Sequence, residues 1–152
     1  MSKLKANAPA PSFSTTDQDG NLAKLEDFRG KKVILYFYPK DDTPGCTKEA
    51  CAFRDAFAEF KLKNTVILGV SPDNEKSHTK FIEKFFLPFP LLCDTEKTIA
   101  KDYEVWVEKS MYGRKYMGVE RSTFLIDENG VLSNILRKVK PEPHVEELLK
   151  LV

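Results

Sequence analysis

The chain lacks several features that mark particular classes of protein. No stretch reaches 18 uninterrupted apolar residues, and residues 1–6 contain no apolar run, so neither a membrane span nor a secretion signal is indicated. Neither sign of charge dominates, since 24 Lys and Arg face 23 Asp and Glu and leave a net charge of +1 at pH 7. This balance argues against an extended nucleic-acid or membrane surface. We therefore expect a cytoplasmic protein that acts on small substrates or binds protein partners.

Internal repeats, low-complexity tracts and linkers are also missing. The length of 152 residues with 41% hydrophobic side chains predicts one domain, residues 1–152, with a sizeable core. Only two histidines are present, His78 and His144, and neither has ligand spacing with a cysteine, so we expect no metal or cofactor. The three cysteines remain notable, because a reducing compartment favours free or catalytic thiols over structural disulfides.

The most informative segment, residues 39–51, is a turn that leads into a helix with two cysteines. Thr43 is placed as the N-cap, Pro44 takes the first helical position, and strong helix formers follow. Cys46 then lies in the first turn, where free backbone amides and the positive end of the helix dipole favour thiolate over thiol. Lowering a cysteine pKa from near 8.5 to about 6 raises the thiolate fraction at neutral pH only about 30-fold. A fast reaction needs further donors that stabilise the transition state.

Cys51 follows Cys46 by five residues. In a regular helix this separation places the two Cα atoms about 8.7 Å apart, whereas a disulfide needs them within about 6.8 Å. A disulfide between them therefore requires local unwinding. The alternative, which the spacing leaves open, is a pair of inert buried thiols. We interpret Cys93, at the end of a short apolar strand, as a buried structural thiol.

Apolar runs alternate with helical patterns along the whole chain, as in an α/β domain. Two turn signals, residues 19–21 and residues 127–130, predict hairpins near each end of the chain. The remaining order predicts a mixed central sheet with helices on both faces. The predicted strands are 12–16, 22–25, 32–38, 65–70, 89–93, 122–126 and 131–139, and the predicted helices are 44–62, 75–86, 96–103 and 142–151.

These residues resemble the peroxiredoxins, which are thiol peroxidases. The pattern consists of Pro39-x3-Thr43-x2-Cys46 with Glu49, followed far along the chain by Arg121-Ser-Thr-Phe-Leu-Ile-Asp127. Cys51, Met111-Tyr-Gly113 and Tyr116-Met-Gly118 make the chain similar to the bacterioferritin-comigratory or Q-type subgroup. The resemblance implies a thioredoxin-like three-layer α/β/α sandwich with a mixed central sheet and an N-terminal β-hairpin. It also implies antioxidant reduction of hydrogen peroxide and organic hydroperoxides to water and alcohols.

The resemblance implies a role for each residue around the first cysteine. Cys46 would be the peroxidatic thiolate that becomes a sulfenic acid. The Thr43 hydroxyl, the amides of Gly45 and Cys46 and the guanidinium of Arg121 would hold the two peroxide oxygens. Arg121 would also favour the thiolate.

Three further roles follow from the same resemblance. Pro39 would form a dry wall over the sulfur, and Glu49 would orient the arginine. Cys51 would be the resolving thiol that forms an intramolecular disulfide, which thioredoxin or a similar dithiol protein would reduce. The intramolecular pair suggests a monomer. The ordinary readings of single residues are a cap for Thr43, a turn for Pro39 and a surface ion pair for Glu49 and Arg121.

Alternative functions are a non-enzymatic thiol redox sensor and a thioredoxin-like disulfide exchange protein. The latter should carry Cys-x-x-Cys, whereas this chain has Cys-x4-Cys. Among the other residues, Trp106 is expected to be a packed aromatic, although the resemblance places it near the site or a partner surface. Residues 109–115 are expected to form a solvated loop, and the apolar segment 85–90 to belong to the core, with any exposed part available for docking.

Overall fold

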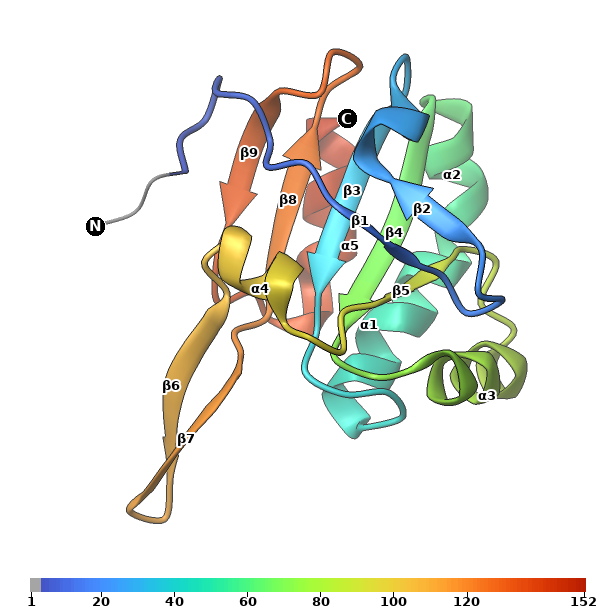
Figure 1. Cartoon of the computed structure of the whole chain (residues 1–152). Coiled ribbons are helices and arrows are strands. Elements are labelled where there is room, and N and C mark those ends of the chain that lie inside the picture. The colour runs from blue at the N-terminus through green and yellow to red at the C-terminus, as the bar shows by residue number, and fades with distance from the viewer. Residues whose placement is uncertain (1–3) are drawn as a thin grey trace.

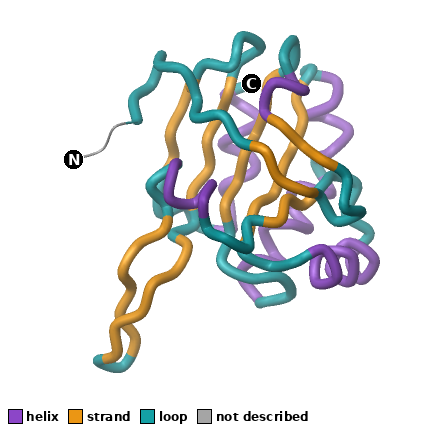
Figure 2. The backbone as a smooth tube through the Cα atoms, viewed as in Figure 1, coloured by secondary structure: helices purple, strands orange, loops and turns teal. Residues whose placement is uncertain are grey.

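The central element is a seven-stranded mixed sheet in the order β2-β1-β5-β4-β3-β8-β9 (Figure 1, Figure 2). The computed structural model describes residues 4–152, with the backbone alone for residues 142 and 143. Residues 1–3, part of the N-terminal stretch considered above, lie outside the described residues. The strands of this sheet are β1 (Ser14–Thr16), β2 (Leu22–Lys24), β3 (Lys32–Phe37), β4 (Thr65–Ser71), β5 (Leu91–Cys93), β8 (Ser122–Ile126) and β9 (Leu132–Leu136).

The middle of the sheet is parallel and buried on both faces. β3 pairs in parallel with β4 from Lys32↔Thr65 to Phe37↔Val70, and β4 pairs in parallel with β5. Strands covered on both sides read as continuous apolar runs, which is why residues 32–37 and 65–71 show no alternation. β8 joins β3 antiparallel, and the β1–β2 hairpin joins β5 antiparallel, so the predicted mixed sheet and N-terminal hairpin are confirmed.

Helices cover both faces of the sheet and enclose two cores. One core takes side chains from α1 (Pro44–Asp55), α2 (Phe57–Leu62), α3 (Glu75–Phe85) and α5 (Pro141–Leu151). The other takes side chains from α4 (Thr98–Asp102) and the 3₁₀ helix η1 (Leu25–Phe28). Figure 1 shows α1, α2 and α5 behind the sheet and α4 in front of it. The predicted three-layer sandwich is confirmed. Among residues 4–152, no helix is long and apolar enough to cross a membrane.

Two predictions of local structure are wrong. The helix expected over residues 44–62 is broken at Ala56, whose φ of −98° and ψ of 4° end α1 before α2 begins. Residues 109–115 do not form a solvated loop, because β6 (Trp106–Met111) and β7 (Arg114–Val119) pair antiparallel as a separate hairpin. This hairpin projects from the body of the molecule (Figure 2).

Candidate active site

The site is built at the start of α1, where the sequence forces a helix to begin. Thr43 is the N-cap residue with extended dihedral angles (φ −96°, ψ 156°), and Pro44 takes the first helical position. The Thr43 side chain does not cap the helix but donates its hydroxyl proton to the Lys40 carbonyl over 2.9 Å. Cys46 is the third residue of α1 and is only 2% exposed. A thiolate at this position would lie beside amides that lack helical partners.

Arg121 joins Cys46 to Glu49 although it lies far from both in the sequence. It stands between the ends of β7 and β8, and its Nη2 donates to the Cys46 sulfur over 3.2 Å. Its Nη1 donates to Glu49 Oε1 over 2.7 Å. One planar guanidinium therefore holds both groups, which a point charge such as an ammonium does not reproduce. The structure thus brings together three residues predicted for the site, and the reading of the Glu49–Arg121 contact as a surface ion pair is wrong, because Glu49 is fully buried.

Burial and charge act in opposite directions on the pKa values of Glu49 and Arg121. Burial raises the pKa of Glu49 to about 7, against the lowering influence of Arg121. Burial works to lower the pKa of Arg121, but the charges of Glu49 and Cys46 raise it above its ordinary value. Arg121 therefore stays cationic beside the sulfur. Glu49 exchanges its proton near neutral pH, so the net charge next to Cys46 depends on pH.

Tyr36, which sequence reasoning treated only as a strand residue, belongs to the same buried cluster. Its pKa is raised well above 10.0 by burial and then by Glu49 and Cys46, so the phenol stays neutral beside them. Within the part of the chain that the structure describes, the Tyr36 hydroxyl and Glu49 Oε2 are buried without a hydrogen-bond partner. The position of Tyr36 in the apolar run of β3 does not indicate that it lies near Cys46 and Glu49. Both polar atoms could still form a hydrogen bond.

Gly45 and Pro39 lie in the helix start and in the turn that leads to it. A Cβ at Gly45 would come within 3.2 Å of Arg121 Nη2 and 3.5 Å of Pro141 Cγ, so a side chain there would displace the guanidinium. Pro39 is half-buried in the turn between β3 and α1. A depression of about 280 Å³ opens beside this helix start, lined by Pro44, Gly45, Lys48 and Pro141.

All three cysteine thiols are free. Cys51 is half-buried and lies within α1 with Cys46, so both belong to one continuous helix. Cys93 is 5% exposed, and its sulfur contacts the Asp17 carbonyl at 3.7 Å. Burial and a hydrogen bond with Glu75 raise the pKa of Cys93 to about 12, which keeps it a thiol at neutral pH. This environment supports the interpretation of Cys93 as a structural thiol.

Two more side chains near Arg121 were missed by sequence reasoning. The half-buried Lys109 on β6 has a pKa lowered by burial and by Arg121, whereas Cys46 and Glu120 act to raise it. His144 on α5 is 2% exposed and forms a hydrogen bond of 2.7 Å between its Nε2 and Thr123 Oγ1. Burial and then Arg121 lower the pKa of His144 to about 4, so the ring is neutral at pH 7. Their spacing in the sequence carries no signal of a common site.

The remaining candidates lie outside this cluster. Trp106 is partly buried against the core on the α4 side of the sheet, as expected for a packed aromatic, and Lys97 Nζ lies 5.8 Å from its ring centroid. In the apolar segment 85–90, Leu87 and Phe89 are buried, whereas Phe86 is 81% exposed at the end of α3. The segment is therefore core only in part.

Residues 6–135 match the sequence model of the AhpC/TSA family. The chain is 51% identical over 147 residues to a protein named peroxiredoxin Bcp from Bacillus subtilis, covering 97% of this chain and 94% of that protein. It is 42% identical to the peroxiredoxin Bcp of Escherichia coli, covering 98% and 96%. A solved structure of a cysteine-to-serine mutant of Xylella fastidiosa PrxQ is similar, with a TM-score of 0.93, 34% identity and coverage of 99% and 96%. A cysteine-to-serine mutant of Xanthomonas campestris peroxiredoxin Q gives a TM-score of 0.88, 38% identity and coverage of 91% and 88%.

Proposed function

Because the chain belongs to the AhpC/TSA family of peroxiredoxins and is therefore a thiol peroxidase, we propose that Cys46 is the thiol that its peroxide substrate oxidises. The observation that carries the proposal is the guanidinium of Arg121, which bridges the buried sulfur and the buried carboxylate of Glu49. This contact places a cationic hydrogen-bond donor 3.2 Å from the sulfur, where it can stabilise negative charge during the attack.

In the first step the Cys46 thiolate attacks one oxygen of the hydroperoxide, and the O–O bond breaks. The sulfur becomes a sulfenic acid, and the other oxygen leaves as water or an alcohol after taking up a proton. Thr43 supports this step because its hydroxyl donates to the Lys40 carbonyl, so its oxygen can act as an acceptor for the peroxide O–H. The amides of Gly45 and Cys46 and the guanidinium of Arg121 stabilise the charge that develops on the oxygens.

Two neighbours act on this step without donating to the substrate. Glu49 fixes the arginine through the 2.7 Å contact, so it is a positioning residue. Pro39 has no N–H and shields the sulfur from water, which strengthens the charge interactions around it.

In the second step Cys51 captures the sulfenic acid. The Cys51 thiol attacks the Cys46 sulfur, a disulfide forms, and the sulfenic oxygen leaves as water. Since both residues lie in α1, the first turns of this helix must unwind to bring the sulfurs into bonding distance. A thioredoxin-type dithiol, the reductant that the family uses, then reduces the disulfide. We further propose that the chain works as a monomer in the cytoplasm, where the three free cysteines stay reduced between turnovers.

The family assignment favours a peroxidase over a non-enzymatic sensor or a disulfide exchange protein. The function is tested by following NADPH oxidation with thioredoxin, thioredoxin reductase and either hydrogen peroxide or an organic hydroperoxide. Cys46→Ser should abolish peroxide-dependent turnover, whereas the matched control Cys93→Ser should retain it. Turnover that persists in Cys46→Ser would exclude the proposed nucleophile.

The resolving step is tested by mass mapping after one equivalent of peroxide. A monomeric product with Cys46 joined to Cys51 and a single free thiol at Cys93 is expected. A bond from Cys46 to Cys93 or to a second chain would rule out Cys51 as the resolving thiol.

A further inference from the structure

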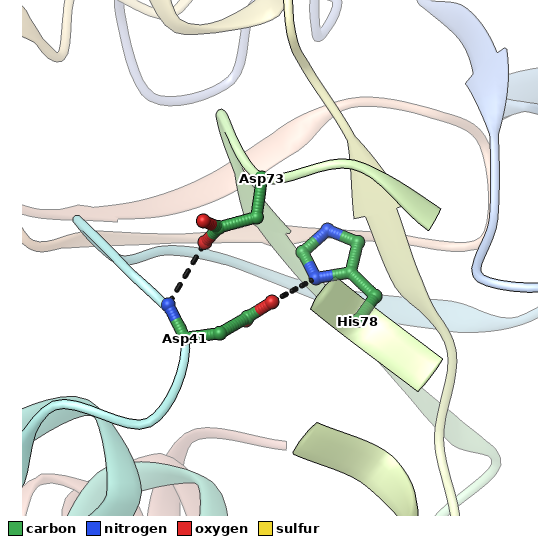
Figure 3. A group of neighbouring side chains, drawn as sticks. All are labelled: Asp41, Asp73 and His78. Atoms are coloured by element: carbon green, nitrogen blue, oxygen red, sulfur yellow. Dashed lines mark hydrogen bonds and ion pairs between the residues drawn. The ribbon is translucent and has the colours of Figure 1, made fainter. Parts of the chain in front are cut away.

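A buried polar network lies beside the turn that precedes α1. His78 on α3 is fully buried, and its Nδ1 lies 2.7 Å from Asp41 Oδ2 (Figure 3). Its Nε2 lies 2.9 Å from the Leu92 carbonyl oxygen. Both ring nitrogens therefore have a hydrogen-bond partner in the protein interior.

Asp41 is the centre of this network. Its carboxylate accepts from the Tyr38 hydroxyl over 2.6 Å and from Ser77 Oγ over 2.7 Å, in addition to the histidine. Burial raises the pKa of Tyr38 well above 10.0, which keeps the phenol proton available for this bond. Three donors converge on a carboxylate that is 8% exposed, so the pair is satisfied rather than isolated in the core.

The backbone of the turn is tied down at the same point. The Asp41 amide donates to Asp73 Oδ2 over 2.8 Å (Figure 3). This oxygen also accepts from Ser71 Oγ. One ligand atom from each of Asp41, Asp73 and His78 lies within 4.8 Å of the others, an arrangement also seen in metal sites. Here both imidazole nitrogens and the facing carboxylate oxygens already take part in hydrogen bonds, so the cluster works as an anchor.

The anchor is connected to the candidate active site by only a few residues. The Lys40 carbonyl, next to Asp41, accepts the Thr43 hydroxyl and so orients the side chain proposed to bind peroxide. Asp42 between them adopts a left-handed conformation with φ of 57°, which the surrounding contacts must hold in place. Asp42 also pairs with Lys84 of α3 over 2.7 Å. The turn that leads to the Cys46 helix start is thus in direct contact with α3.

We propose that Asp41 and His78 are positioning residues of the peroxidase reaction, which hold Thr43 and the start of α1 in the arrangement that reacts with peroxide. The pair also limits how far the chain unwinds on the N-terminal side of Cys46 when the disulfide forms. This inference rests on the proposed function of Cys46 and Cys51. The pair acts through the backbone of residues 40–43, to which Asp41 belongs.

The test compares Asp41→Asn, His78→Gln and the double variant with Leu132→Ala. Leu132 is fully buried in the core on the opposite side of the sheet, so its truncation lowers global stability without touching the turn. Stopped-flow measurements give the rate of Cys46 oxidation and the rate of the following disulfide formation. Mass spectrometry gives the fraction of Cys46 that is overoxidised at high peroxide. Ser77→Ala, which removes one hydrogen bond to Asp41, is the milder substitute if Asp41→Asn and His78→Gln do not fold.

Asp41→Asn and His78→Gln should each slow Cys46 oxidation about tenfold, because the reactive arrangement is less populated. Disulfide formation should be unchanged or faster, and the overoxidised fraction of Cys46 should fall. The double variant should be no slower than either single one, since the residues act as a unit. Ser77→Ala should change the rates in the same direction by about threefold. Leu132→Ala should keep both rates within about twofold of wild type.

The inference is overturned if Asp41→Asn and His78→Gln oxidise Cys46 at the wild-type rate. It is also overturned if Leu132→Ala, at an equal loss of stability, slows Cys46 oxidation as much as they do. Amide hydrogen exchange over residues 40–48 gives an independent readout, because the variants should exchange faster there than in β3 or β4. A wild-type protein that reduces no peroxide refutes the proposed function. Exchange at residues 40–48 then still decides whether the pair anchors the turn.

Discussion

Glu49→Gln should remove one component of the pH dependence of stability. The side chain is fully buried, and burial raises its pKa from 4.5 to about 7 in the folded protein. The fold therefore favours the neutral acid over the carboxylate. A raised pKa of this kind gives stability that is fully present below pH 4.5 and is lost as the pH rises through about 7.

The magnitude follows from the two pKa values. At about 1.4 kcal/mol per pKa unit, moving from 4.5 to about 7 corresponds to about 3 kcal/mol of unfolding free energy. Glutamine has the shape of the neutral acid and does not titrate. The unfolding free energy of Glu49→Gln minus that of wild type should therefore rise by about 3 kcal/mol between pH 4 and pH 8.

Urea denaturation at steps of half a pH unit, with a reductant to keep the thiols reduced, measures this difference. The exposed Glu59 on α2, changed to Gln, is the matched control, and its difference from wild type should stay flat with pH. A flat difference for Glu49→Gln as well would refute the reasoning. It would mean that Arg121 compensates the burial of the carboxylate completely.

Three further predictions concern neighbouring groups. Arg121→Lys keeps the charge but loses the planar guanidinium that reaches both the sulfur and Glu49, so the rate of Cys46 oxidation in stopped-flow measurements should fall about 100-fold. The control Arg137→Lys should leave this rate unchanged. Equal rates for the two variants would argue against a role for the guanidinium geometry. His144 favours its neutral ring, with a pKa lowered from 6.5 to about 4, so stability present above pH 6.5 is lost as the pH falls through about 4. His144→Gln should narrow the gap between melting temperatures at pH 7 and pH 4, and an unchanged gap would contradict this. Gly69→Ala places a Cβ 2.7 Å from Leu91 Cδ2 and 3.0 Å from the Tyr36 hydroxyl. Urea denaturation should therefore show a loss of about 1–3 kcal/mol in unfolding free energy. No loss would show that the sheet relaxes around the added methyl group.

Much of the fold was predictable because its signals are local. Apolar runs and turn residues predicted the strands of the main sheet, and Thr43 with Pro44 predicted the start of α1. The break at Ala56 has no Pro or Gly to announce it. The hairpin β6–β7 was missed because neither of its faces is consistently apolar, so period-2 alternation is weak.

The site was predictable only where a family pattern linked distant residues. Arg121 and Glu49 are 72 positions apart, and the resemblance, not the spacing, predicted that they meet. The environment of Tyr36, Lys109 and His144 carried no such signal, because burial and electrostatic coupling appear only in the folded chain. The roles assigned to individual site residues stay predictions until the variants are measured.

The ring stack around Phe53 has a consequence for the oxidised protein. Phe53 is fully buried two positions after Cys51, with its ring centroid 4.6 Å from that of Tyr36 on β3. Unwinding that begins at Pro44 would meet this aromatic clamp immediately after the second cysteine. We therefore expect the core around Phe53 to be the same in the two redox forms, so that NMR signals of Phe60 and Phe89, whose rings pack on Phe53, barely shift on oxidation. A reductase would then bind a short unwound segment that carries the disulfide, on a surface otherwise the same as in the reduced protein.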